Sequence, residues 1–353
     1  MTEDADPSSP RERPRQPSAV RTLMKGVGVT LMVLLVLAAA LYLNRRAAAR
    51  ELLVGWLERK GVDADVEVER LEINGFVGKI SIGDPKNPDF KVERVEVDYA
   101  LGLPWSKARL GVTPSRVRLV RPIVRAAWKD GKLSLGSLDP LVEEFTGKPP
   151  KPDLRAPLVI VERGQARIDT EYGPVNLLAD ARIDNGKLMR LSGRMPAASL
   201  KSGGIEARGL GGVIEATTTG DRLAVALDLQ AERFAAKDQA SGEGAVLHLK
   251  GDLPYPDMKT RRGDGRVALT GRFTADAAGG AGVNSRAVNA DLVFDGQVAG
   301  WINRYDLKGK GRLATTAGSV AAEGLQARAL DLGLTDAEVA VAGAWRPTRR
   351  AGR

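Results

Sequence analysis

The chain has 353 residues, a formal net charge of +9 and no cysteine. Without cysteine it can form neither disulfides nor thiolate metal sites. Aromatic residues make up only 5% of the chain while glycine accounts for 40 positions, a balance that favours thin, turn-rich β structure over one large packed globule. The basic residues mostly alternate with Glu and Asp, as in KVERVEVDY, which is typical of a solvated strand face and argues against a nucleic-acid partner.

The first distinctive segment is residues 26–43, GVGVTLMVLLVLAAALYL, an apolar run of 18 residues without charge. This length is near the lower limit for a helix that spans a membrane. The alternative is a cleaved signal peptide, because Ala47 to Ala49 could serve as a small-residue cleavage site. The length of the run and the helical pattern after it favour an uncleaved anchor. Lysine and arginine are more numerous before the run than just after it, which predicts a cytoplasmic N-terminus.

Residues 44–61 predict a helix that continues from the anchor. The helical period places Leu52, Leu53, Trp56 and Leu57 on one face. This face either packs on the first strands or lies on the membrane surface, and we favour packing on the strands.

From Val66 onward the apolar residues recur with a period of two, which predicts β-strands. Asn-Gly and Asp-Gly dipeptides recur between the runs, and both suit tight antiparallel turns. We therefore expect a long antiparallel meander with one apolar and one wet face. The clearest aligned apolar side chains are Leu223, Val225, Leu227 and Leu229 in one run, and Val267, Leu269 and Phe273 in another.

A short repeat predicts two strand irregularities. VERLEI at 68–73 returns as VERVEV at 92–97, and in both copies the alternation slips by one residue at the Glu-Arg step. One extra residue in a strand is the signature of a β-bulge, so we expect a bulge in each copy.

One further helix is predicted in SLDPLVEEFTG, where Asp139 stands at the N-cap position and Pro140 at the first helical position. The Pro-rich residues 148–153 follow and predict a stiff linker between two β regions.

A sheet with one apolar face needs a cover, which can be a second sheet, helices or a ligand. Helices are scarce in the pattern, and so are large aromatics that would fill a core. The strands therefore either fold on each other as a sandwich or barrel, or the sheet curls into a trough that holds something else, such as acyl chains. Composition alone favours the sandwich, because it is the commoner solution.

No pattern in the chain supports catalysis, a metal site or a cofactor. The only histidine, His248, stands in AVLHLKGD without a recognisable catalytic partner, so we interpret it as an ordinary strand residue. GKGRLA at 309–314 matches the string of a dinucleotide fingerprint but is not followed by a helix, and we interpret it as a turn. We expect no enzyme.

The N-terminal half resembles the AsmA-like superfamily, of the YdbH and TamB type. The resemblance rests on the single anchor, on VERLEINGFVGKISIGD and FKVERVEVDYALGLPW, and on VRLVRPIVRAAWKDGKLSLGSLDPL. It covers roughly residues 25–195 and is diffuse afterwards.

The resemblance implies an inner-membrane protein with its bulk in the periplasm, built as an elongated, curled β-sheet whose apolar groove carries phospholipid towards the outer membrane. In this interpretation the seven aligned side chains named above line the groove. About 18 strands at about 4.8 Å spacing would extend roughly 85 Å, less than we expect a self-sufficient bridge to need, so a protein partner at the outer membrane or in the periplasm is implied. The alternatives are an assembly factor for outer-membrane β-proteins and a tethered structural β-domain without a ligand.

These predictions divide the chain into successive parts along its length. The parts are a disordered cytoplasmic tail (1–25), the anchor (26–43), the juxtamembrane helix (44–61), a first β unit (62–147), the linker (148–153), a second extended β region (154–343) and a basic tail (344–353).

Overall fold

The computed structural model describes most of the chain after residue 45. The described residues are 46–47, 49–51, 53–102, 111–129, 132–141, 155–237, 239–257, 262–300, 304–322 and 324–344. The chain divides into two compact units, Met1–Ala49 and Arg50–Arg353, and all strands of the described residues belong to the second.

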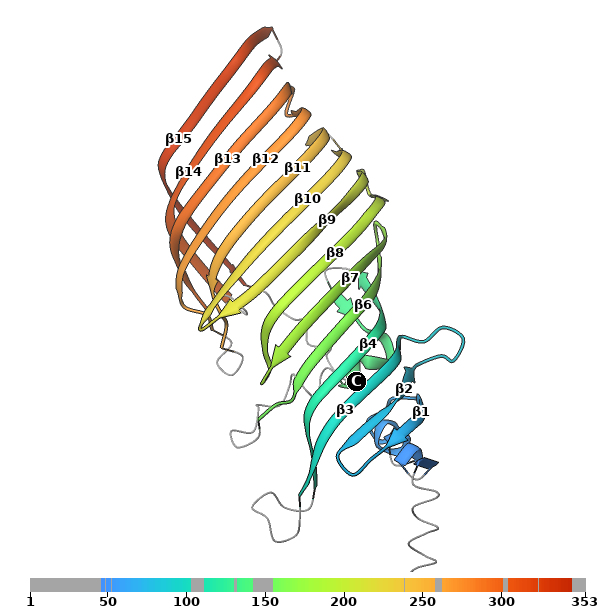
Figure 1. The fold of residues 1–353 in the computed structure, drawn as a ribbon. Coiled ribbons are helices and arrows are strands. Elements are labelled where there is room, and N and C mark those ends of the chain that lie inside the picture. The colour runs from blue at the N-terminus through green and yellow to red at the C-terminus, as the bar shows by residue number, and fades with distance from the viewer. Residues whose placement is uncertain are drawn as a thin grey trace, which may run out of the picture. The chain divides into compact units, whose positions relative to one another are not determined.

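The second unit is dominated by one curled β-sheet, which is drawn in Figure 1. The prediction of a mostly β fold, curled and not closed, with few short helices, is confirmed. The strands are β1 (Ala64–Leu71), β2 (Gly75–Ile82), β3 (Phe90–Gly102), β4 (Gly111–Lys129), β5 (Lys132–Ser134), β6 (Leu158–Thr170), β7 (Gly173–Asp184), β8 (Lys187–Ser202), β9 (Ile205–Thr219), β10 (Arg222–Ala236), β11 (Ala240–Pro254), β12 (Gly265–Gly280), β13 (Val283–Ala299), β14 (Arg304–Ala322) and β15 (Leu325–Ala344).

The strand order is the sequence order, from β1 to β15, with only β5 off the path as a hairpin partner of β4. The path holds fewer strands than we expected because the strands are long, up to the 20 residues of β15. Fourteen adjacent strands at about 4.8 Å spacing extend roughly 60 Å across the sheet.

One junction departs from the predicted antiparallel meander. β4 and β6 pair in parallel, with Val117 beside Val159 and Ala126 beside Ile168. A parallel pair needs a connection of a dozen residues or more, and the stretch between Lys129 and Leu158 supplies it. Because β4 and β6 are paired, the two predicted β regions belong to one sheet. The predicted linker, 148–153, lies outside the described residues.

The predicted anchor, residues 26–43, also lies outside the described residues. Within the part of the chain that the structure describes, no helix combines the length and the apolar character that a membrane crossing requires. Residues 53–59 are helical, as predicted for the juxtamembrane segment.

The helical residues 53–59 do pack on the first strands, but with a different face from the predicted one. Leu57 is buried and Val54 packs beside it, whereas Leu53 and Trp56 are exposed. The contacting face is therefore rotated from the predicted one: it keeps Leu57 and adds Val54.

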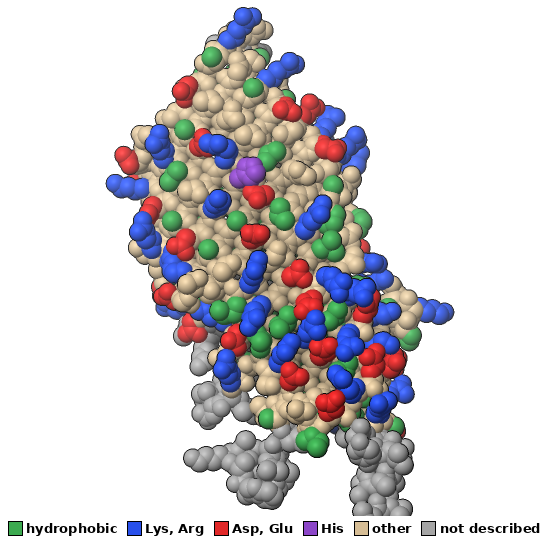
Figure 2. Space-filling view, in the orientation of Figure 1, with side chains coloured by type: hydrophobic (Ala, Val, Ile, Leu, Met, Phe, Trp, Pro, Cys, Tyr) green, Lys and Arg blue, Asp and Glu red, His purple; other side chains and the backbone are tan. Residues whose placement is uncertain are grey.

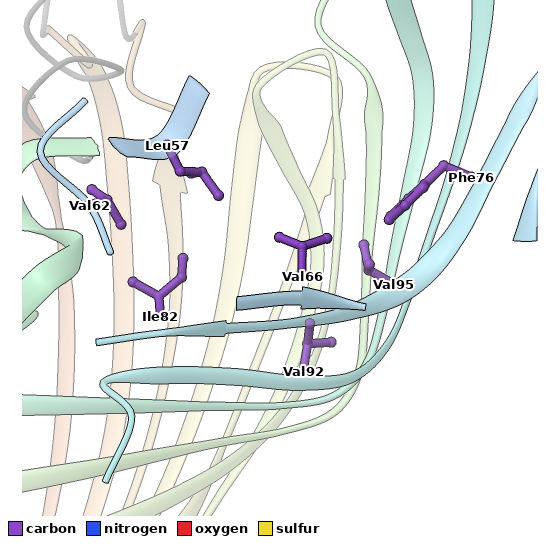
Figure 3. Close-up of a cluster of buried hydrophobic side chains, with 7 residues drawn as sticks. All are labelled: Leu57, Val62, Val66, Phe76, Ile82, Val92 and Val95. Carbon is purple, nitrogen blue, oxygen red and sulfur yellow. The ribbon is translucent and has the colours of Figure 1, made fainter. Parts of the chain in front are cut away.

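A compact apolar cluster joins this helix to β1, β2 and β3. Figure 3 shows the side chain of Leu57 facing those of the strands. Val62, Val66 and Val92 are the largest side chains that are almost wholly buried, so this cluster is the best-packed part of the described chain. Its seven members are Leu57, Val62, Val66, Phe76, Ile82, Val92 and Val95.

Both predicted bulges are confirmed. The β1·β2 register shifts between Val68 and Arg70, and the β2·β3 register shifts between Gly78 and Ile80, where Val95 and Val92 are the partners. Each bulge therefore falls at the Glu-Arg step of its repeat copy. The extra residue keeps the apolar side chains before and after it on one face, because it compensates for the slip in alternation.

A longer crease crosses the second half of the sheet. In each of the seven successive strands β9 to β15, one residue has no paired residue in the neighbouring strand, although the residues on both sides of it are paired. In alternate strands this residue has a left-handed backbone, with φ between 52° and 62° for Gly209, Gly244, Ala287 and Ala329. The unpaired residue shifts the period-two alternation by one position. Apolar side chains before and after it therefore point to the same face of the sheet. The crease consists of Gly209, Glu232, Gly244, Asp276, Ala287, Gly318 and Ala329.

An ion-pair network holds the parallel junction on the opposite, polar face. Arg118 of β4 donates two hydrogen bonds of 2.8 Å to Glu162 of β6 and one of 3.1 Å to Glu96 of β3. The hydrogen bond from Arg118 lowers the pKa of Glu162, and hydrogen bonds from Arg94 and then Arg118 lower the pKa of Glu96. A forked guanidinium that contacts both neighbouring strands is suited to fixing their register.

We expect Arg118→Gln to lower the midpoint of thermal unfolding at neutral pH. Carboxylates whose pKa is lowered by folding stabilise the fold above their unfolded pKa, and this contribution is lost as the pH falls through the folded value. The difference between wild type and Arg118→Gln should therefore shrink below about pH 4. Circular dichroism melts across pH measure it, and an equal difference at every pH would contradict the assignment.

An open apolar trough as the candidate functional site

The seven predicted groove side chains share one face of the sheet. In the β10·β11 register, Leu227 lies beside Leu249 and Leu229 beside Leu247. Leu247 in turn lies beside Phe273 of β12. The four leucine and valine side chains of β10 are therefore continuous, through β11, with Val267, Leu269 and Phe273.

The same face continues in both directions. Towards the end of the chain, Leu292 of β13 lies beside Leu313 of β14, which lies beside Leu334 of β15. Towards the start, Leu227 lies beside Ile214 of β9. From β9 to β15, the described residues that the register places on this face include no Asp, Glu, Lys or Arg. A face this wide without charge is a candidate for binding apolar material.

No second layer covers this face over β9 to β15 in the described part of the chain. Leu332 and Leu334 are both 57% exposed, and Leu292, Leu313 and Val341 are also exposed. Our composition-based preference for a sandwich is therefore wrong, because a single curled sheet takes its place. We call the apolar face of β9 to β15 the trough.

At the other end, over β1 to β3, the apolar face is covered by the chain itself. Besides the 53–59 helix, Leu138 and Leu141 pack against the buried cluster. A short 3-10 helix, η1 (Gly136–Leu138), carries this segment, and Asp89 holds it by accepting hydrogen bonds from Ser137 N (2.8 Å) and Ser137 Oγ (2.7 Å).

The predicted cap of this helix is wrong. Asp139 has helical backbone angles and lies within the helical turn, because the turn begins at Gly136, ahead of the predicted start. Its carboxylate accepts hydrogen bonds from Leu135 N and Ser134 Oγ, both at 2.7 Å.

Phenylalanine rings on the apolar face lie flat over glycines of the same or neighbouring strands. A Cβ added at Gly296 or Gly309 would come within 2.6 or 2.8 Å of the Phe294 ring. The ring of Phe234 occupies the equivalent space over Gly242. Phe294 is only 6% exposed and forms a buried cluster with Val267 and Val298, so at this place side chains of the sheet itself fill the apolar face.

The opposite face is polar and studded with charge, as Figure 2 shows around the single histidine. His248 Nδ1 lies 2.5 Å from Asp228 Oδ1, and both side chains are about half exposed. Arg272, which lies beside His248 in the ladder, binds Asp291 at 2.7 Å. These are cross-strand pairs of a solvated sheet, and among the described residues no group of side chains could hold a metal ion.

GKGRLA, residues 309–314, lies inside β14 and is not a turn, which corrects our interpretation. Gly309 and Gly311 serve close packing on the apolar face: a Cβ at Gly309 would lie 2.5 Å from the Cα of Gly296. The glycines are therefore explained without a nucleotide.

Several trough residues were missing from our candidate set. Leu247, Leu249 and Leu253 of β11 complete the face between the two predicted runs, and their alternation in VLHLKGDL was a usable signal. Leu292 and Leu313 are also trough residues, since the register pairs them with each other on this face.

Comparison of the chain with models of known protein families found no match, and comparisons with curated proteins and with solved structures likewise found none. The resemblance to the AsmA-like superfamily therefore stays a prediction.

We expect Gly309→Ala to destabilise the fold by about 1–3 kcal/mol, because the new Cβ would meet backbone atoms that cannot move aside. The added atom would lie 2.3 Å from the carbonyl oxygen of Asp295. Gly333→Ala is the matched control, since a Cβ there has nothing within 4 Å. Denaturant unfolding measures both variants, and equal stabilities would show that the close β13·β14 contact is not needed.

Proposed function

We propose that the protein is a membrane-anchored lipid carrier whose trough shields acyl chains from water. The observation that supports the proposal best is the wide face from β9 to β15 that carries no charge and has no covering layer in the described chain. Each methylene transferred from water to such a surface contributes about 0.8 kcal/mol. A chain that left this face empty would expose far more contiguous apolar surface than soluble proteins normally tolerate.

The proposed setting of the carrier rests on the predicted anchor and on the resemblance to the AsmA-like superfamily. In this proposal residues 26–43 anchor it in an inner membrane, the sheet lies in the periplasm, and phospholipid moves along the trough between inner and outer membranes, in support of the cell envelope. The extent of the sheet, roughly 60 Å, is short for such a path, so the proposal includes a protein partner that continues it.

The charges on the polar face support a sheet with water on one side and acyl chains on the other. Its exposed cross-strand ion pairs, such as Arg222–Asp252 at 2.8 Å and Arg272–Asp291 at 2.7 Å, keep the outside of the sheet wet. One side of the strands is thus suited to water and the other to hydrocarbon.

Leu227→Asp is expected to abolish lipid retention without unfolding the sheet. The substitution places a carboxylate in the middle of the uncharged face, where an acyl chain could not solvate it. Ala226→Asp is the matched control, because Ala226 lies on the polar face of the same strand, beside Lys250. Phospholipid bound per purified chain is measured by mass spectrometry, with circular dichroism to verify folding.

The control variant should keep wild-type lipid content. If folded Leu227→Asp also kept it, acyl chains would not lie on this face and the proposed function would fall.

A further inference from the structure

One buried hydroxyl interrupts the apolar face. Thr218, near the end of β9, is 5% exposed, and its Oγ1 is the one buried side-chain polar atom without a hydrogen-bond partner among the described residues. The register places Thr218 beside Leu223, a trough residue, and Ala216 on the same face is also buried. A buried hydroxyl with no partner costs stability, so its presence here calls for an acceptor that the protein alone does not supply.

Thr218 lies at the rim of the trough, just before the turn at Gly220 and Asp221. Tyr255, which follows β11, joins three elements at this rim. Its backbone N donates to Asp221 O at 2.6 Å, and its hydroxyl accepts a hydrogen bond of 2.8 Å from Leu188 N of β8. These hydrogen bonds connect β8, the β9–β10 turn and the segment after β11, so the three elements are held together at this corner of the sheet.

A cationic side chain, that of Lys187, lies at the same corner. Lys187, the first residue of β8, donates from Nζ to the carbonyl oxygen of Gly220, two residues from Thr218. Its Nζ also lies 4.9 Å from the centre of the Tyr255 ring. An ammonium group has three donors, and the Gly220 carbonyl uses one, so Lys187 retains capacity for an anion.

From the trough outward, the surroundings change from aliphatic side chains to a hydroxyl donor and then to a cation. The ester-linked end of a glycerophospholipid changes in the same order, from acyl chain to ester carbonyl, which only accepts hydrogen bonds, and then to phosphate. We propose that this rim binds the glycerol-ester and phosphate groups of a glycerophospholipid, with Thr218 donating to an ester carbonyl and Lys187 contacting the phosphate. The proposal rests on the proposed function and assigns a polar anchoring site to the trough.

The test compares two lipids that differ only at the ester. The full-length protein is offered equal amounts of dioleoyl phosphatidylethanolamine and its ether-linked analogue, which lacks the carbonyls, and bound lipid is counted by mass spectrometry. We expect the wild type to retain the ester lipid about two- to tenfold better, the effect of one hydrogen bond. Thr218→Val, which keeps the shape and removes the hydroxyl, should show no preference, and Thr218→Ser should restore it.

Thr217→Val is the matched control, because Thr217 is exposed on the other face of β9, and it should keep the preference. Loss of preference in this control, or equal retention of the two lipids by the wild type, would overturn the site while leaving the trough intact. Retention of neither lipid would overturn the proposed function together with the site. Since Thr218→Val removes an unsatisfied buried hydroxyl, it should fold at least as well as the wild type.

A second variant tests the phosphate contact. Lys187→Gln should reduce the preference for phosphatidylethanolamine over diacylglycerol with the same chains, while the ester preference at Thr218 remains. Added inorganic phosphate should not displace the lipid, because the acyl chains supply most of the binding. An unchanged preference in Lys187→Gln would overturn the role of Lys187, and displacement of the lipid by phosphate would contradict binding chiefly through the acyl chains.

Discussion

The apolar face of the sheet is the constraint on which the rest of the structure depends. Every strand from β1 to β15 must keep one side free of charge, and the strands lie side by side in sequence order. Each strand is therefore held chiefly by backbone hydrogen bonds to two neighbours, with little help from a distant core. Such an arrangement is quasi-one-dimensional, as in repeat proteins, so its stability is close to a sum of neighbour terms.

Several local features preserve that face where regular alternation would lose it. The bulges of β1 and β3 return the apolar side chains to the apolar face after the Glu-Arg step. The crease does the same for the side chains of β9 to β15. Gly209 and Gly244 suit left-handed positions in the crease, but Ala287 and Ala329 adopt them at some energetic cost. We infer that continuity of the apolar face across all seven strands outweighs this cost. The ring of Phe294 lies over glycines, so it adds little thickness to the sheet on this face.

Much of the strand content could be predicted from period-two alternation, because it is a local signal. The Asn-Gly and Asp-Gly dipeptides were less reliable: Asn185-Gly186 forms the turn between β7 and β8, but Asp295-Gly296 lies inside β13. The shared face of Leu223 to Leu229 followed from alternation alone. The parallel pairing of β4 with β6 did not, since it depends on a long connection whose length does not by itself specify an orientation. The open trough was underrated because composition cannot distinguish a sheet that covers itself from one that does not. Thr218 also escaped notice, since a threonine near a turn is unremarkable until its burial is known.

The apolar face is covered at one end of the sheet and uncovered at the other. The cluster around Val66 and Val92 fills the face over β1 to β3, whereas Leu332 and Leu334 of β15 are exposed. The best-packed region is thus at the β1 end of the sheet, and the region with the most exposed aliphatic side chains is at the β15 end. The packed end stabilises the sheet, and the uncovered remainder of the apolar face is where we propose that a ligand binds.

The most direct test of the central claim is the lipid content of the wild-type soluble part, residues 45–345, purified from a bacterial periplasm without detergent. Mass spectrometry of the folded, monodisperse protein should find phospholipid at a reproducible ratio above one per chain, since the account places acyl chains along the uncharged face of several strands. A folded and monodisperse protein free of lipid would contradict the account, because the uncharged face would then be stable without acyl chains.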